Sequence, residues 1–161
     1  MKDDQLDASV ALLSNLLKGG NSHATFADAV KDLPLDAAGK KVQNVPYTIW
    51  QLVEHIRIAQ WDLLEFSRNA EHKSPKWPAG YWVVQRAPKD ESEWQQALQR
   101  IEKERNEFVA LLENNKEKLF EPFTYGNGQT LFKEALVLAD HNAYHIGEMI
   151  IIRRFLGVWN K

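Results

Sequence analysis

Residues 131–156 have the sequence LFKEALVLADHNAYHIGEMIIIRRFL, and this stretch indicates the fold class. Its apolar residues recur at the three- and four-residue spacing of one helix face. Thr130, directly before the stretch, is a residue type that caps helix N-termini well. We therefore expect a long amphipathic helix that ends near Leu156. The residues expected on its inner face are Leu131, Ala135, Leu138, Met149 and Leu156.

Three other segments have the same helical periodicity. They cover residues 4–18, 48–67 and 90–113. The first ends at a Gly-Gly pair, which favours helix termination. Thr48 and Asp90 are the expected N-caps of the other two, and Glu93 is placed close to where a capping box needs it. Four amphipathic helices without a strand pattern predict an all-α fold, a four-helix bundle.

Two of the connections between these helices are long. We expect a short helical piece at residues 25–32 and a loop at residues 36–46, which are polar and aperiodic. Residues 69–89 contain three prolines, which disfavour a helix. The same loop carries large aromatic residues: Trp77, Tyr81 and Trp82. It should therefore pack over the bundle or over the mouth of a site, with plain packing as the alternative to a pocket wall. Long connections also permit crossovers.

Length and composition favour one domain over residues 1–161. The chain is 44% hydrophobic and 26% charged, which is enough apolar material for one core. It has no cysteine, which excludes disulfides and cysteine ligands and suits the cytosol. The net charge of −2 gives no general attraction to nucleic acid or to an anionic membrane. Without a signal peptide or the ~20 apolar residues of a membrane span, the chain is expected to be cytoplasmic.

His141 and His145 are the first candidates for chemistry. Four residues apart on a helix, they differ by about 40° around the axis and about 6 Å along it, so both rings can reach one point. Two histidines at this spacing form a helical metal clamp, but such pairs also occur on solvated helix faces. Both lie at the edge of the expected apolar stripe, which favours the metal interpretation.

His55 lies at the same kind of edge on the helix expected at residues 48–67. A histidine there is usually a partly buried residue bonded to a carbonyl, and this alternative stays open. Three such histidines on two helices can instead converge on one ion. Three neutral imidazoles suit a divalent transition metal, with zinc or nickel favoured and iron or manganese as further options. A three-ligand site keeps a fourth position for water or substrate, which is the catalytic pattern.

Four stretches of the sequence match a known family pattern. They are TIWQLVEHI at 48–56, WDLLEFS at 61–67, GNGQTL at 126–131 and DHNAYHIG at 140–147. Through them the chain resembles the DinB/YfiT-like metalloenzymes over nearly its whole length. The family has one histidine in its second helix and a His-x-x-x-His in its fourth, which His55, His141 and His145 match completely.

This resemblance implies a four-helix bundle with a long crossover, often dimeric, and these three histidines as the metal ligands. Some members of the family are transferases that use a low-molecular-weight thiol such as bacillithiol or mycothiol, and many have no assigned reaction. The resemblance therefore implies a small-molecule substrate, possible use of such a thiol, and a homodimer. It does not choose a substrate.

Asp62 is a candidate for a supporting or catalytic role. It lies two turns after His55 on the same helix face, where a carboxylate could orient a histidine or act as a base. The alternative is a surface carboxylate beside Arg57 or Arg68, two nearby cations.

Glu148 is the second carboxylate candidate, one turn after His145. It could hold a ligand histidine from behind, and the alternative is an exposed partner for Arg153 or Lys161. Asn142 falls near the middle of the apolar face, so we expect its amide to bond to backbone between helices.

The remaining histidines, His23 and His72, have simpler expectations. His23 follows the first helix and is expected to cap the next one, while His72, in the proline-rich loop, is expected to be exposed.

Two classes of function follow from these observations. The first is a divalent-metal-dependent enzyme, a thiol-dependent S-transferase or hydrolase that acts on a small electrophile. The second is a non-catalytic metal-binding, dimerising stress-response protein on the same bundle. The free coordination position favours the enzyme, and the absence of an obvious acid–base partner weighs against it. An open cavity beside the histidines would support the enzyme, whereas a fourth protein ligand would support the binding protein.

Overall fold

Six α-helices are present in a computed structural model of the chain, which describes residues 3–19 and 21–159. They are α1 (Asp3–Lys18), α2 (Phe26–Val30), α3 (Leu35–Ala38), α4 (Ile49–Arg68), α5 (Glu91–Asn114) and α6 (Leu131–Phe155). Two short 3₁₀ turns, η1 (Ala79–Tyr81) and η2 (Lys116–Lys118), lie in the connections. These described residues contain no strand, which confirms the all-α prediction. None of the described helices is both long and apolar enough to cross a membrane.

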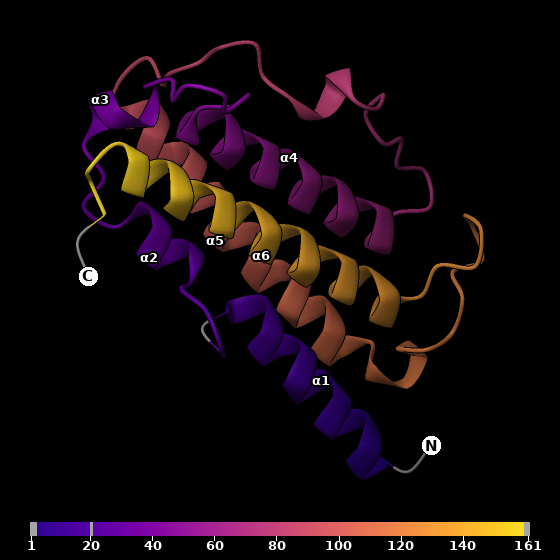
Figure 1. Cartoon of the computed structure of the whole chain (residues 1–161). Helices are drawn as coiled ribbons and strands as arrows, with labels where there is room; N and C mark the ends of the chain where they lie inside the picture. Colours follow the sequence, from indigo (N-terminus) through magenta and orange to yellow (C-terminus); the bar gives the residue numbers. More distant parts are fainter. Residues whose placement is uncertain (1–2, 20, 160–161) are drawn as a thin grey trace.

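The four long helices form a bundle in which α1 and α4 lie at opposite corners. Helix α4 packs against α5 and α6, and α1 packs against the same two helices. Helices α4 and α5 run in the same direction, whereas α1 and α6 run in the opposite one (Figure 1). The connection between α4 and α5 must therefore return along the length of the bundle. Residues 69–89 make this crossover beside α4, so the bundle has the long crossover expected for it.

The long helices begin at the residues expected to cap them. Thr48 Oγ1 accepts a hydrogen bond from the Gln51 N–H and the Gln51 side chain accepts one from the Thr48 N–H, which makes a capping box. Asp90 caps α5 by accepting from the Glu93 N–H at 2.8 Å. The reciprocal bond of a capping box is missing there, because the Glu93 carboxylate bonds to the backbone N–H of the residue before Asp90.

The connection between α1 and α4 differs from the expectation in two places. The short helical piece expected at residues 25–32 is α2, which already ends at Val30. Residues 36–46 were expected to be a loop throughout, but α3 extends to Ala38. Four residues are too few to show a helical period in the sequence. The turn is held by tertiary packing, since Ala37 and Ala38 are both buried.

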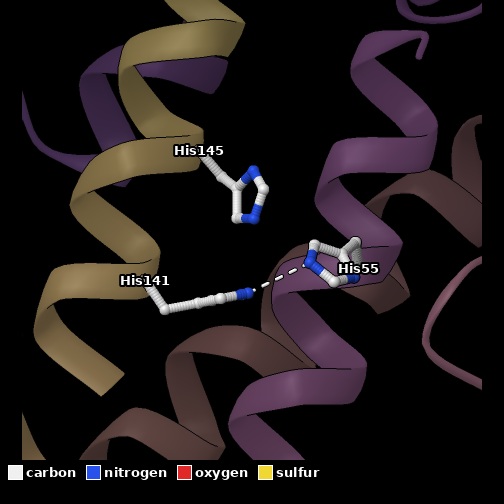
Figure 2. A group of neighbouring side chains, drawn as sticks. All are labelled: His55, His141 and His145. Carbon is white, nitrogen blue, oxygen red and sulfur yellow. Dashed lines mark hydrogen bonds between the residues drawn. The ribbon is translucent and has the colours of Figure 1, made fainter. Parts of the chain in front are cut away.

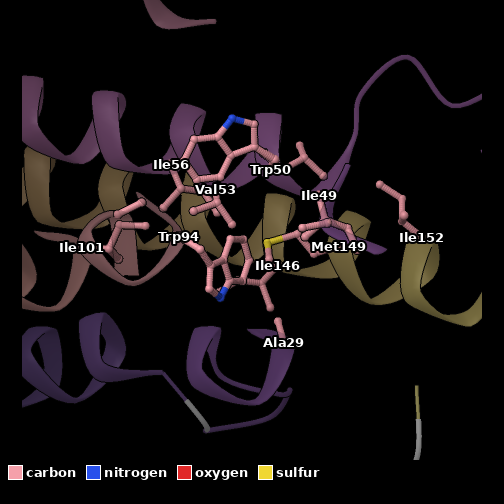
Figure 3. Packing of buried hydrophobic residues seen from close by; sticks show 13 residues of the cluster. Ala29, Ile49, Trp50, Val53, Ile56, Trp94, Ile101, Ile146, Met149 and Ile152 are labelled. Atoms are coloured by element: carbon pink, nitrogen blue, oxygen red, sulfur yellow. The ribbon is translucent and has the colours of Figure 1, made fainter. Parts of the chain in front are cut away.

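A polar layer divides the apolar core into two clusters. The first joins the N-terminal halves of α4 and α5 to the C-terminal half of α6, with Ala29 of α2 at its edge (Figure 3). Trp50 and Trp94 pack in it with ring centroids 6.2 Å apart. The second cluster joins the other ends of α4 and α5 to α1 and to the start of α6.

Gln60 forms the centre of the polar layer and is fully buried. Its Nε2 donates to the Ile101 carbonyl at 2.7 Å, and its Oε1 accepts from Asn142 Nδ2 at 3.3 Å. These bonds connect α4, α5 and α6, as a buried amide requires. Asn142 thus bonds between helices as predicted, but its partner is a side chain of α4 and not backbone, so that part of the prediction was wrong.

Candidate metal centre

Three histidines converge between α4 and α6. His55 extends from α4, and His141 and His145 extend from successive turns of α6 toward it (Figure 2). One ring nitrogen of each lies within 4.8 Å of the others. His55 and His145 are buried and His141 is half-buried. The cluster consists of these three residues in the described part of the chain, with no fourth His, Cys, Asp or Glu.

The partners of two rings fix which nitrogen of each ring faces the centre. His55 Nδ1 lies 2.9 Å from the Tyr81 carbonyl, and His145 Nδ1 lies 2.7 Å from Glu148 Oε2. A carbonyl and a carboxylate can only accept, so both Nδ1 atoms must donate. In the neutral ring the Nε2 atom then carries a free lone pair, which is the form that binds a metal.

The contact between His55 and His141 also leaves nitrogen lone pairs facing the centre of the cluster. His141 Nδ1 lies 3.3 Å from Asn142 Oδ1, and its Nε2 lies 3.0 Å from His55 Nε2 (Figure 2). If both Nδ1 atoms donate, two nitrogen lone pairs face each other across 3.0 Å. A cation between them would turn this repulsion into attraction. Two nitrogens bound tetrahedrally at ~2.0–2.1 Å from one ion lie little farther apart than this.

Burial favours the neutral form of two of the rings, those of His141 and His55. The pKa of His141 is lowered to about 4, first by desolvation and then by the neighbouring His145. Desolvation also lowers the pKa of His55, against the opposing effect of its bond to the Tyr81 carbonyl. A neutral imidazole is the ligand form of histidine, so these two rings do not have to lose protons near neutral pH before they can bind a metal.

Aromatic rings cover one side of the cluster. Trp82 stacks on His55 with centroids 3.9 Å apart, and Tyr47 stacks on Trp82 at 4.0 Å. Tyr144 packs edge-on against His145 at 5.0 Å. The aromatic loop thus packs over the site, which is one of the two placements expected for it. Trp77 is an exception, because it is 73% exposed and is not part of this wall. Tyr47 and Tyr144 were not predicted; both are sequence neighbours of a cap or a ligand.

Asp62 is buried and binds the crossover loop. It accepts from the Tyr81 hydroxyl at 2.5 Å and from His72 Nε2 at 2.7 Å. It is therefore not a surface partner of Arg57 or Arg68, which pair with glutamates. The histidine that it orients directly is His72, which the sequence did not suggest.

The expectation that His72 is exposed was wrong. Only 7% of its side chain is accessible, because the ring lies against Asp62 and packs edge-on to Trp61. A proline-rich loop gives no periodic signal from which this burial could have been predicted.

A ladder of side chains along α4 fixes the crossover loop. Asp62 accepts from the Tyr81 hydroxyl, and His55 donates to the Tyr81 carbonyl. Nearer the start of α4, Gln51 donates to the Val83 carbonyl and Thr48 donates to the Arg86 carbonyl. The loop thereby passes over the site in a fixed register. Tyr81 is the central connection, since its hydroxyl binds Asp62 while its carbonyl orients His55.

Replacing Tyr81 by phenylalanine is expected to lower the free energy of unfolding by about 2 kcal/mol, because a hydrogen bond to a charged acceptor contributes ~1.5–3 kcal/mol. Urea denaturation of the two proteins measures the difference. Tyr144→Phe is the matched control, because Tyr144 is 66% exposed. An unchanged midpoint for Tyr81→Phe would show that Asp62 does not anchor the loop through this hydroxyl.

Glu148 supports His145 and borders a cavity. Its carboxylate binds His145 Nδ1, while Arg153 binds the backbone carbonyls of Ala29 and Val158 instead. The other partner considered, Lys161, lies outside the described residues. A cavity of about 410 Å³ lies beside the cluster, lined by Glu148 and by Tyr47 of the aromatic stack. The histidine rings themselves do not line this cavity.

His23 is not a part of this centre. It is exposed, and its Nδ1 donates to the Ala24 carbonyl at 2.9 Å. The cap of α2 is Thr25, which makes a full capping box with Asp28, so the predicted capping role of His23 was wrong.

Comparison with known families places most of the chain in one of them. The family model of the DinB superfamily matches residues 21–149. This span contains α4, α5 and most of α6, and with them all three histidines of the cluster. Comparison with curated proteins and with solved structures gave no match.

Proposed function

This chain belongs to the DinB superfamily, and we propose that it is a metal-dependent enzyme in which His55, His141 and His145 bind one divalent transition metal. The observation that carries this proposal is the convergence of three imidazoles whose Nδ1 atoms are all engaged by acceptors. Nothing but the Nε2 lone pairs is then left to face the centre. Zinc or nickel is the favoured ion, with iron or manganese as further options.

The protein's part in the reaction is to hold three ligands, which leaves a fourth coordination position for water or substrate. Tyr81, Asn142 and Glu148 each orient one imidazole through its Nδ1. Trp82 and Tyr47 exclude water from one side of His55. A divalent metal held there would act as a Lewis acid and favour the deprotonated form of a thiol or water at neutral pH.

The proposed reaction is transfer of a low-molecular-weight thiol to a small electrophile, or hydrolysis of such a compound. Two features support an enzyme over a closed binding site. The cluster has three protein ligands in the described chain, and a cavity of about 410 Å³ adjoins it at Glu148. This volume lies within the ~300–1,000 Å³ of small-molecule sites.

A thiol-transfer assay tests the proposal. The metal-reconstituted protein is incubated with an aryl halide electrophile and each of several thiols: dithiothreitol, cysteine, bacillithiol and mycothiol. We expect one thiol to give a metal-dependent rate that is lost in His145→Ala. A protein that binds metal but accelerates neither thiol transfer nor hydrolysis would favour the alternative, a non-catalytic metal-binding stress-response protein.

Glu148→Gln is expected to weaken metal binding by about 10–100-fold, the usual effect of removing the outer partner of a ligand histidine. The amide keeps the size of the side chain but is a weaker acceptor for His145 Nδ1. Competition with a chromophoric chelator measures the affinity. Glu134→Gln, which alters a buried carboxylate of α6, is the control and should retain the parent affinity. Equal affinities for all three proteins would mean that Glu148 does not support His145.

Homodimerisation in the cytoplasm remains part of the proposal. Helix α6 exposes Val137, Tyr144 and Ile151 at seven-residue spacing, with between 41% and 66% of each residue accessible. A stripe of this kind is suited to pairing with another helix. Light scattering should then give a mass near twice the 18.6 kDa of the monomer.

A further inference from the structure

A second cavity, of about 380 Å³, lies between α1, α2, α5 and α6, and none of the three histidines lines it. Most of its wall is apolar and is formed by Leu16, Leu17, Phe26, Ile101, Ala143 and Ile146. Sites for small molecules have this character, with a mainly apolar lining and a few polar groups that fix the ligand.

The amides that line this cavity are already paired. Gln60 donates to the Ile101 carbonyl and accepts from Asn142, so the two side chains bond to each other and to backbone. Because these hydrogen bonds are already made, the two amides do not need a polar ligand as a partner. An apolar group could lie against them without leaving a buried amide unsatisfied.

Arg105 is a polar residue of the cavity wall that lacks hydrogen-bond partners for some of its donors. Its Nε is buried and has no hydrogen-bond partner in the described part of the chain. Its Nη2 makes only long contacts, 3.3 Å to Asn106 Oδ1 and 3.8 Å to Glu102 Oε1. Only 23% of the side chain is exposed. An arginine with a mostly buried side chain and free donors is well suited to bind a carboxylate, because its planar fork matches the geometry of that group.

The charges around the cavity also favour an anion. Lys18 and Arg105 line it as cations, and Asp140 is its one lining carboxylate. Asp140 is exposed, whereas Arg105 is mostly buried, so the charge felt inside the cavity is dominated by the guanidinium.

We propose that this cavity binds a small carboxylic acid with an apolar body, such as a medium-chain fatty acid. The carboxylate would take the free donors of Arg105, and the chain would lie against the apolar wall. The site is distinct from the metal centre, although Asn142 contacts both Gln60 and His141. The proposed carboxylic-acid site therefore does not depend on the reaction proposed for the histidines.

Calorimetric titration of the full chain with sodium octanoate tests this site. We expect saturable binding, and binding of octanol, which has the same body without the charge, should be about tenfold weaker or more. Arg105→Gln should weaken octanoate binding by about tenfold or more and leave octanol binding unchanged. Ala143→Leu, which fills the cavity, should weaken both. His55→Ala, which disables the metal centre, should bind octanoate like the parent.

Two results would overturn the assignment. One is the absence of saturable octanoate binding by the folded parent at millimolar concentration. The other is equal octanoate binding by the parent and Arg105→Gln. Circular dichroism establishes that each variant is folded. If Ala143→Leu does not fold, Leu16→Trp takes the place of that variant in the comparison. Leu16 also lines the cavity, and a larger side chain should be tolerated there because the residue is 40% exposed.

Discussion

Replacing His141 by alanine is expected to remove the bound metal while the helices remain folded. Two imidazoles hold a divalent ion far more weakly than three, and we expect the loss to exceed the ~10–100-fold caused by removing an outer partner. His141 is half-buried and lies at the edge of the core, so its loss should not unfold the bundle. Plasma mass spectrometry after dialysis measures the metal content, and circular dichroism measures the helicity.

His55→Ala and His145→Ala should behave in the same way, because each also contributes one ligand. The matched control is His23→Ala, since His23 is exposed and donates to the neighbouring Ala24 carbonyl. His72 is unsuitable as a control because it is bonded to Asp62. Equal metal content in His141→Ala and the parent would show that the pair on α6 is structural, and the metal proposal would fail.

The helices, and the position of each histidine at the edge of an apolar stripe, could be predicted from the sequence because both depend on local periodicity. That the three rings form one metal site was implied by the family resemblance. Helix α6 follows its apolar spacing from Thr130 onward, and the four-residue spacing of His141 and His145 places both rings on one side of it. His55 was found by the same angular argument on α4. Each of these conclusions needs only the 3.6-residue turn and the direction of the core.

The crossover loop could not be predicted in the same way, because its contacts join residues that are far apart in the sequence. Asp62 and His72 are ten residues apart and Thr48 and Arg86 are 38 apart. Prolines remove periodicity, so nothing local showed that His72 is buried or that the Tyr81 carbonyl orients His55. Gln60 does carry a local signal: it follows Ile56 by four residues on the buried stripe, the same kind of position that leads one to expect a buried amide at Asn142.

The depressed pKa of His141 should make the metal-free protein less stable in acid. An unfolded histidine titrates near 6.5, whereas burial holds His141 near 4, so between these values the unfolded chain binds a proton that the native chain does not. The stabilisation is complete above about pH 6.5 and is lost as the pH falls towards 4. Each pKa unit corresponds to about 1.4 kcal/mol, so His141 accounts for about 3 kcal/mol over this range.

Another buried group acts in the opposite direction and has to be separated from His141. Desolvation raises the pKa of Glu104 to about 7, so acidification below that value favours its native, protonated form. The slope of stability against pH for the parent alone therefore mixes the two effects. The difference between the parent and His141→Ala removes the contribution of Glu104, because both proteins contain it.

Urea denaturation of the parent and of His141→Ala in the presence of a chelator, at several pH values from about 7 to about 4.5, measures that difference. The parent should lose more stability than the variant on acidification, and most of the divergence should occur below about pH 6.5, where the unfolded histidine takes up its proton. His55 shifts in the same direction and is present in both proteins, so it does not create the divergence. Parallel curves would mean that His141 titrates normally in the folded chain. The ring would then be solvated and not held neutral against His55 and His145, and the preformed ligand set would be lost with it.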